Sequence, residues 1–175
     1  MESLESRFEN NPRRKQEMRG RPIADAIYRS VLGDDINITR FENNYILDKE
    51  FAIDVQVSLP SGLILLGQEK FLSFERSGFR SVTVEYMQNP VTGEKGDWFK
   101  LGVQFYFVGY FTASGNDFYP WIMLHWPAVV LMTHSGSIKW IDQVNKDGKA
   151  KASLRYAFMD GLPKICVIAS RLVDN

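Results

Sequence analysis

The sequence predicts a strand-rich α/β fold in which a mixed central sheet is flanked by a few helices. A length of 175 residues suits a single domain with its own hydrophobic core. Apolar residues recur at every fourth position in one early segment and at every second position in several later ones, which are the periods of a helix and of strands. Hydrophobic residues make up 45% of the chain and charged residues 24%, so a globular chain is expected rather than a disordered one.

The first predicted element is a short helix that begins at Pro22. Proline is favoured in the first helical turn, and apolar residues follow at a spacing of four, at Ile23, Ile27 and Val31. Few large apolar side chains precede Pro22. Residues 1–21 are therefore expected to form a flexible basic arm outside the core, and residues 22–175 a single domain.

An amphipathic hairpin is predicted after this helix. Apolar and polar residues alternate in its first strand, whose apolar face is formed by Phe51, Ile53, Val55 and Val57. Pro60 and Gly62 predict a turn over residues 58–62, and the second strand follows over residues 63–72.

Later segments complete the predicted fold. A short helix near Trp98 and a helix started by Pro127 are expected among them. Further strands are expected over residues 81–86, 105–111, 138–141, 153–158 and 165–169.

The whole chain has no net charge, but basic residues cluster near its N-terminus. The 21 Lys and Arg residues balance 21 Asp and Glu residues, so the whole chain has no excess charge to attract a polyanion. The cluster near the N-terminus is either a solvated terminus or an arm that contacts nucleic-acid phosphates. Its members are Arg13, Arg14, Lys15, Arg19 and Arg21.

Cysteine usage and hydropathy favour a cytoplasmic protein. Cys166 is the single cysteine, which excludes an intramolecular disulfide and a zinc site built from cysteines. The longest nearly apolar run, residues 121–132, is shorter than the roughly 20 residues that span a bilayer. No apolar block stands near the N-terminus, so neither a secretory signal nor a membrane partner is expected.

Three polar residues of the hairpin are candidates for a catalytic site. Asp54 and Gln68 are separated by 14 positions, and the midpoint of their numbers falls on Ser61 in the predicted turn. In a hairpin symmetric about Ser61 these two residues would face each other with Cβ atoms roughly 5 Å apart, and Lys70 would share their face.

The chemistry of these residues suits phosphodiester hydrolysis. A carboxylate and an amide oxygen can bind a hard divalent cation, and a lysine can polarise a water molecule and stabilise developing negative charge. The same residues could instead be ordinary cross-strand neighbours that stabilise the sheet by roughly 0.2–1 kcal/mol. Spacing alone leaves both interpretations open.

The hairpin resembles the PD-(D/E)XK, or restriction-endonuclease-like, nuclease superfamily over residues 51–56 and 62–70. In that family an acidic residue ends one strand and the next strand carries an acid-x-Lys triplet. By this resemblance Asp54 would bridge metal ions, Gln68 would occupy the acid position and Lys70 would be the catalytic lysine. The backbone carbonyl of Glu69 would be a further metal ligand.

The resemblance covers about residues 22–112 and implies a restriction-endonuclease-like sheet, a Mg²⁺ or Mn²⁺ cofactor and a DNA partner. Gln68 departs from the family pattern, since an acid is expected there. Its neutral amide removes one negative charge, which would weaken metal binding or abolish activity.

Three acids are candidates for an accessory role. Asp25 lies in the predicted helix about 160° from the centre of the apolar stripe, so its side chain is expected to face solvent. Asp48 would share the face of Asp54 if the first strand begins early enough. Glu85 is on the polar face of the next predicted strand.

These observations favour a metal-dependent DNA endonuclease, of a size that would suit phage or mobile-element DNA processing and that could act as a homodimer. The alternative is a non-catalytic nucleic-acid-binding or assembly protein that retains the nuclease fold. The neutral Gln68 and the zero net charge favour the alternative.

Overall fold

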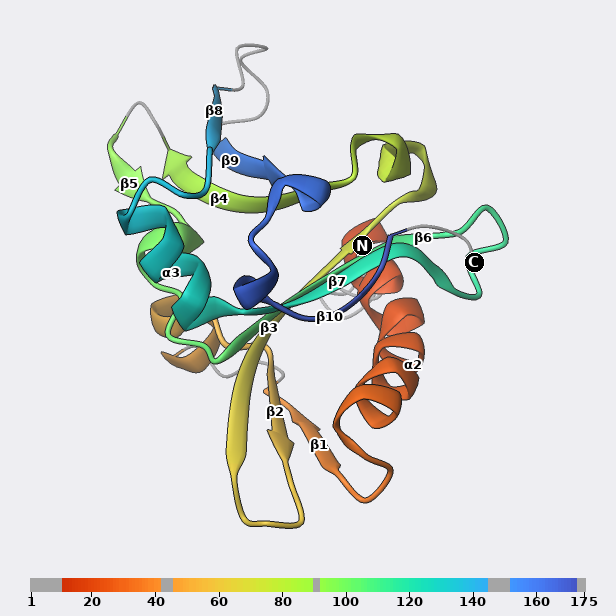
Figure 1. Ribbon diagram of the computed structural model, residues 1–175. Coiled ribbons are helices and arrows are strands. Elements are labelled where there is room, and N and C mark those ends of the chain that lie inside the picture. Colours follow the sequence, from red (N-terminus) through yellow and green to blue (C-terminus); the bar gives the residue numbers. More distant parts are fainter. Residues whose placement is uncertain (1–10, 42–45, 90–91, 145–151, 173–175) are drawn as a thin grey trace, which may run out of the picture.

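The computed structural model of the protein describes residues 11–41, 46–89, 92–144 and 152–172. The described chain folds into two β-sheets and two α-helices, which makes it a mixed α/β protein as the sequence predicts (Figure 1). No described helix is both long enough and apolar enough to cross a bilayer.

The larger sheet has six strands in the order β1-β2-β3-β6-β7-β10. Only β3 and β6 run parallel, so the sheet is mixed. The bounds of its strands are β1 Asn37–Arg40, β2 Val55–Ser58, β3 Ile64–Leu72, β6 Phe105–Phe111, β7 Phe118–His125 and β10 Val167–Arg171.

The smaller sheet is antiparallel, with the order β5-β4-β9-β8. Two of its strands lie in the connection between β3 and β6. Its bounds are β4 Ser81–Asn89, β5 Glu94–Lys95, β8 Ile141–Val144 and β9 Ser153–Phe158. This second sheet was not predicted, because periodicity identifies strands but does not say which strands pair.

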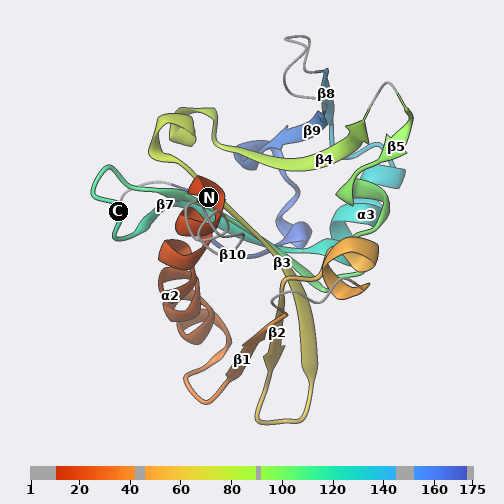
Figure 2. The same ribbon diagram turned by 180° about the vertical axis from the view of Figure 1, so that it is seen from behind.

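Two hydrophobic cores cover the two faces of the larger sheet. Helix α2 (Pro12–Leu32) packs on one face, and helix α3 (Trp126–His134) packs on the other together with the smaller sheet (Figures 1 and 2). Every residue of β6 is buried, as expected for a strand that contributes to both cores. Its odd-numbered Phe105 and Phe107 face α2, whereas Tyr106 and Val108 face the opposite core.

The predicted start of the first helix at Pro22 was wrong. Helix α2 begins at Pro12 and contains Pro22, so residues 12–21 are helical and are not a flexible arm. Arg, Lys, Gln, Glu and Met, which dominate this stretch, are good helix formers. Tertiary contacts then hold it, since Gln16 Nε2 donates to the Phe71 carbonyl at 2.8 Å and Gly20 is buried against the Phe71 ring. Residues 1–10 lie outside the described part of the chain.

The first strand of the hairpin is shorter than predicted. Strand β2 begins at Val55 rather than Phe51, because residues Ile46–Glu50 form a π-helical turn and Ala52 has a φ of 49°. Strands β1, β5 and β7 were missed, whereas the strands over 63–72, 81–86, 105–111 and 153–158 and helix α3 are confirmed. The strands predicted over 138–141 and 165–169 lie two to three residues later, as β8 and β10.

Candidate functional site

The β2–β3 hairpin has the predicted symmetry as far as Val55. Val55 pairs with Gly67 and Ser58 with Ile64, so the pairs are centred on Ser61. The turn is closed by a hydrogen bond from the Gly62 amide to the Leu59 carbonyl at 2.9 Å. The prediction of an antiparallel register around this turn is therefore confirmed.

The regular alternation breaks at Asp54. Its amide donates to the Gly67 carbonyl at 2.9 Å, although Gly67 is already paired with Val55, so two residues of one strand oppose one of the other. This is the arrangement of a β-bulge. As a consequence Ile53 belongs to the core on the side of the smaller sheet, whereas Val55 faces α2. The ladder does not extend to a direct pairing of Asp54 with Gln68.

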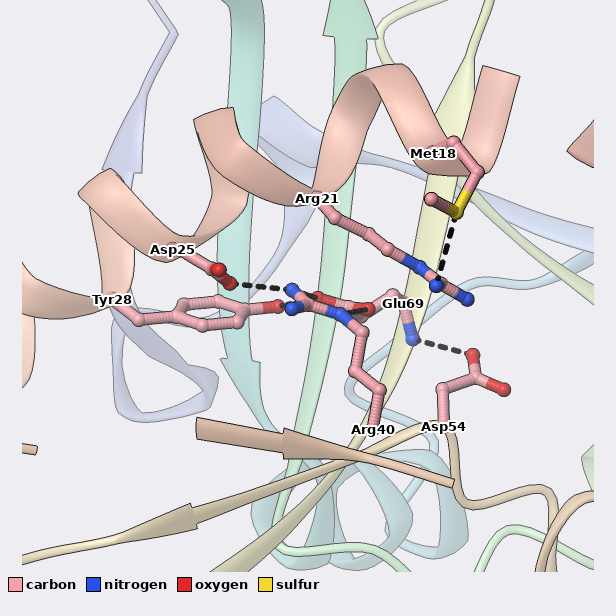
Figure 3. Close-up of polar contacts among 7 residues, drawn as sticks. All are labelled: Met18, Arg21, Asp25, Tyr28, Arg40, Asp54 and Glu69. Carbon is pink, nitrogen blue, oxygen red and sulfur yellow. Dashed lines mark hydrogen bonds and ion pairs between the residues drawn. The ribbon is translucent and has the colours of Figure 1, made fainter. Parts of the chain in front are cut away.

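The bulge places the Asp54 carboxylate at the edge of β3. Its Oδ2 atom accepts a hydrogen bond from the Glu69 amide at 3.0 Å, in the position where a continued β2 would supply a carbonyl (Figure 3). Further along this edge, the Phe71 carbonyl accepts from the side chain of Gln16 on α2. The pairing of β2 with β3 ends at Gly67, and we call the unpaired edge of β3 beyond it the split between β2 and β3. Two side chains cover this edge, that of Asp54 and that of Gln16 from α2.

The Glu69 carbonyl faces the same edge as the Asp54 carboxylate. The amide and carbonyl of one strand residue point to the same neighbouring strand, and the Glu69 amide points to Asp54. The backbone oxygen predicted as a metal ligand is thus on the same side of β3 as the predicted metal-binding aspartate.

Gln68 is a buried residue with an unsatisfied acceptor. It is 9% exposed, and its Oε1 atom has no hydrogen-bond partner within the described chain. Across the parallel ladder it pairs with Tyr106, whose hydroxyl donates to the Thr83 carbonyl at 2.8 Å. A buried acceptor without a donor is destabilising, so an oxygen left in this state is suited to a cation or an ordered water.

Lys70 follows Gln68 on the same face of β3, as predicted from the strand period. It pairs with Val108 of β6 and is half-buried. The intervening Glu69 projects to the opposite face, toward α2, which the alternation also predicts.

The Glu69 side chain is the centre of a buried ionic cluster (Figure 3). Its two carboxylate oxygens accept from Nε and Nη2 of Arg40, both at 2.9 Å, and Oε1 also accepts from the Tyr28 hydroxyl at 2.9 Å. Arg40 Nη2 reaches the Asp25 carboxylate at 2.6 Å as well. The side chain of Glu69 is only 5% exposed and that of Arg40 13%.

The electrostatics of this cluster fix the protonation states of Arg40 and Tyr28. Burial alone would lower the pKa of Arg40, but its hydrogen bonds to Glu69 and Asp25 raise that pKa above the ordinary value. Burial, followed by the nearby Glu69 charge, raises the pKa of the Tyr28 phenol. Arg40 is therefore charged and Tyr28 protonated throughout the physiological pH range.

The structure corrects the expectation that Asp25 faces solvent. Its side chain is 34% exposed and contacts Arg40, because the buried stripe of α2 centres on Ala24 and Tyr28 and not on Ile23. This rotation moves the buried face of the helix toward Asp25.

The other two accessory acids do not join the hairpin, although Glu85 lies in the strand where the sequence placed it. Asp48 is in the helical turn Ile46–Glu50 and not on a strand. Glu85 is in β4, which belongs to the smaller sheet and is not hydrogen-bonded to the β2–β3 hairpin.

The predicted nucleic-acid-binding residues Arg13, Arg14, Lys15, Arg19 and Arg21 all lie on α2. Arg19 is held by the β6–β7 turn, where its Nη2 donates to the Ser114 carbonyl at 2.7 Å and its guanidinium lies 5.5 Å from the Phe111 ring centroid. Lys15 is exposed. The Arg21 guanidinium, which contacts Met18 Sδ at 3.3 Å, extends toward the region of Asp54 (Figure 3).

Tyr28 and Arg40 were missed by the sequence reasoning. Arg40 ends β1, a strand that was not predicted, and Tyr28 lies one helical turn after Ala24 on the buried face. Among the described residues no group of three or more His, Cys, Asp or Glu side chains could hold a metal. A cation at the hairpin would therefore need amide and carbonyl oxygens as well.

No known family model, curated protein or solved structure matches this chain. The function must therefore be argued from the arrangement of these residues.

Proposed function

We propose that this protein is a metal-dependent DNA endonuclease of the PD-(D/E)XK class, with its active site at the split between β2 and β3. One observation carries the proposal. The Asp54 carboxylate is held against the edge of β3 at the Glu69 amide, inside the Gln68-Glu69-Lys70 triplet. Asp54 directly precedes β2 and does not end it, and an aspartate at a strand terminus beside such a triplet on the next strand resembles the pattern of that class.

The donor groups fit a hard divalent cation. Asp54 supplies a carboxylate, the Glu69 carbonyl shares its edge, and the Oε1 atom of Gln68 is buried without a partner in the described chain. Mg²⁺ and Mn²⁺ prefer such oxygen ligands and retain several waters. A cation bound there would lower the pKa of a bound water and offset charge on a phosphoryl oxygen.

The protein's own residues would orient the metal ligands, activate the attacking water and contact the DNA. The Glu69 amide fixes the orientation of the Asp54 carboxylate, and Lys70 would polarise the attacking water and stabilise negative charge on the phosphate. Lys15 and Arg21 of α2 would contact the DNA backbone, which gives an interaction that weakens with salt. An enzyme of this size would suit phage or mobile-element DNA processing, and a homodimer would allow cleavage of both strands.

The test is nicking of supercoiled plasmid in Mg²⁺ or Mn²⁺. Wild type is expected to nick the plasmid, and Asp54→Ala and Lys70→Ala are each expected to lose about a hundredfold or more in rate. Asp160→Ala and Lys139→Ala, which remove exposed charges outside the hairpin, are the matched controls and should keep the wild-type rate. Equal nicking by all five proteins, or no nicking by wild type, would reject the endonuclease.

The second candidate is a nucleic-acid-binding protein that keeps the fold without catalysis. A specific observation favours it. Gln68 contributes no charge, and Arg40 offsets one of the two negative charges of Glu69 and Asp25, which reduces the negative charge near the split that could attract a cation. A gel-shift assay decides between the two, since DNA binding without cleavage in either metal supports this candidate.

A further inference from the structure

The ionic cluster is connected to the proposed active site through a single residue. The Glu69 side chain is held on the α2 face by Arg40 and Tyr28, while the backbone amide of the same residue holds the Asp54 carboxylate. Any displacement of the Glu69 side chain that moves β3 therefore also moves the Glu69 amide and the Glu69 carbonyl, which face Asp54.

Arg40 has the geometry to fix Glu69 in one place. Its Nε and Nη2 atoms bind the two different carboxylate oxygens of Glu69, and this two-point contact fixes orientation as well as distance. Lysine carries the same charge but cannot make such a planar contact. Arg40 is itself anchored, because its Nη2 atom also binds Asp25 on α2.

Because the cluster is buried, the Glu69 carboxylate needs the charge of Arg40 beside it. Glu69 is 5% exposed on its side chain, so its carboxylate would be left without a counter-charge if Arg40 were removed. The contacts also join three elements, since Arg40 ends β1, Glu69 lies in β3, and Asp25 and Tyr28 belong to α2. The cluster thus sets where α2 and β1 lie relative to the β2–β3 split.

We infer that Arg40 is a positioning residue of the active site, which acts through Glu69 to hold the Asp54 carboxylate and the Glu69 carbonyl in place for a divalent cation. This inference rests on the proposed function and adds a role for a residue outside the hairpin. It also gives the middle residue of the triplet a purpose, because an apolar side chain there could not be held by Arg40.

The first measurement is made on metal-free protein and follows the Glu69 amide by NMR. Its proton is hydrogen-bonded to a carboxylate and should resonate downfield in wild type. Arg40→Lys is expected to move this resonance, whereas Arg155→Lys, which disrupts a similar two-point contact to Asp142 in the smaller sheet, should leave it in place. An unchanged Glu69 resonance in a folded Arg40→Lys protein would overturn the inference, whether or not the protein cleaves DNA.

The second measurement is direct Mn²⁺ binding, followed by electron paramagnetic resonance. Arg40→Lys should raise the dissociation constant about tenfold, as expected for a partner that orients a ligand, and Tyr28→Phe, which removes one hydrogen bond, should raise it less. A thermal melt confirms that each variant is folded at the assay temperature. Equal affinity in wild type and Arg40→Lys would overturn the positioning role.

The two proposals fail in different ways. If wild type binds no Mn²⁺, the metal-dependent function is rejected, and the positioning role toward a cation is rejected with it. If wild type binds Mn²⁺ and cleaves DNA but Arg40→Lys behaves identically, the function stands and only the role of Arg40 is overturned.

Discussion

At the scale of single residues, Gln68 is the side chain that most needs a physical account. A carboxylate buried in its place, beside the apolar β6 strand, would be desolvated and would have a raised pKa in the absence of a cation. An amide offers the same kind of oxygen ligand without that cost of burying a charge. The glutamine is therefore compatible with a site that is stable when empty and binds its cation weakly.

Gln68→Glu is expected to lower the stability of the metal-free protein and to raise its affinity for metal. A buried glutamic acid has a folded-state pKa above its unfolded value, so the stability it contributes is present below about pH 4 and is lost as pH rises through the folded pKa. At pH 7 without metal the variant should therefore be less stable than wild type by roughly 1–4 kcal/mol. Thermal melts with and without Mn²⁺ should show a larger stabilisation by metal for the variant than for wild type.

Gln68→Met is the matched comparison for this experiment. It has a similar volume and removes the unsatisfied oxygen, so the metal-free protein should be as stable as wild type or more so. The response to Mn²⁺ should be smaller. The ligand role of Gln68 is contradicted if wild type, Gln68→Glu and Gln68→Met gain equally from the metal.

At the scale of elements, helix α2 approaches the larger sheet closely at a glycine. A Cβ atom on Gly20 would lie 2.5 Å from Cδ2 of Phe71. The Phe71 ring has little room to move, because it stacks on Phe118 with ring centroids 5.2 Å apart and makes a T-shaped contact with Phe107 with centroids 6.2 Å apart. The lack of a side chain at Gly20 thus allows α2 to pack this close to β3.

Gly20→Ala is expected to destabilise the protein although alanine is the better helix former. The steric cost of roughly 1–3 kcal/mol exceeds the gain of up to about 1 kcal/mol in helix propensity, so urea unfolding should show a net loss of about 1–2 kcal/mol. Gly78→Ala is the control, since a Cβ there meets nothing within 4 Å, and it should change stability by less than about 0.5 kcal/mol. Equal effects of the two substitutions would contradict the close approach.

The sequence predicted those features of the elements that depend on local pattern. The register of the hairpin follows from strand alternation and the turn at Gly62, and it is found as expected up to Val55. The bulge at Asp54 was not predictable, because it depends on the preceding π-helical turn and on the backbone of Ala52. The extension of α2 to Pro12 depends on contacts with Phe71, 55 residues from Gln16 in the chain.

The candidate site shows the same division. Spacing around one turn could single out Asp54 and the 68–70 triplet as candidates, but it wrongly predicted that Asp54 directly faces Gln68. The partners of Glu69 could not be found from spacing, because Tyr28 and Arg40 are 41 and 29 residues away and meet Glu69 only once α2 and β1 have packed on β3. Long-range ionic contacts leave no periodic signal in a single sequence.

At the scale of the whole molecule, the two sheets share one hydrophobic core. Val84 of the smaller sheet, Val108 of the larger sheet and Trp126 of α3 belong to the same buried cluster. Trp98 joins it, with its ring 5.8 Å from Trp126 and 4.9 Å from Trp140. Because β4 and β5 lie between β3 and β6 in the chain, the parallel β3–β6 pairing and the smaller sheet are expected to form together.

This shared core predicts a single cooperative unfolding transition for both sheets. Tryptophan fluorescence and far-UV circular dichroism should give the same melting temperature. Val84→Ala removes a fully buried side chain of the smaller sheet, and a loss of about 2 kcal/mol should lower that common temperature by roughly 4–8 °C. Gln143→Ala, at an exposed position of the same sheet, should leave the melting temperature unchanged. If the smaller sheet were an independent unit, Val84→Ala would split the melt into two transitions and leave the one reported by Trp121, which packs on the α2 side, where it is in wild type.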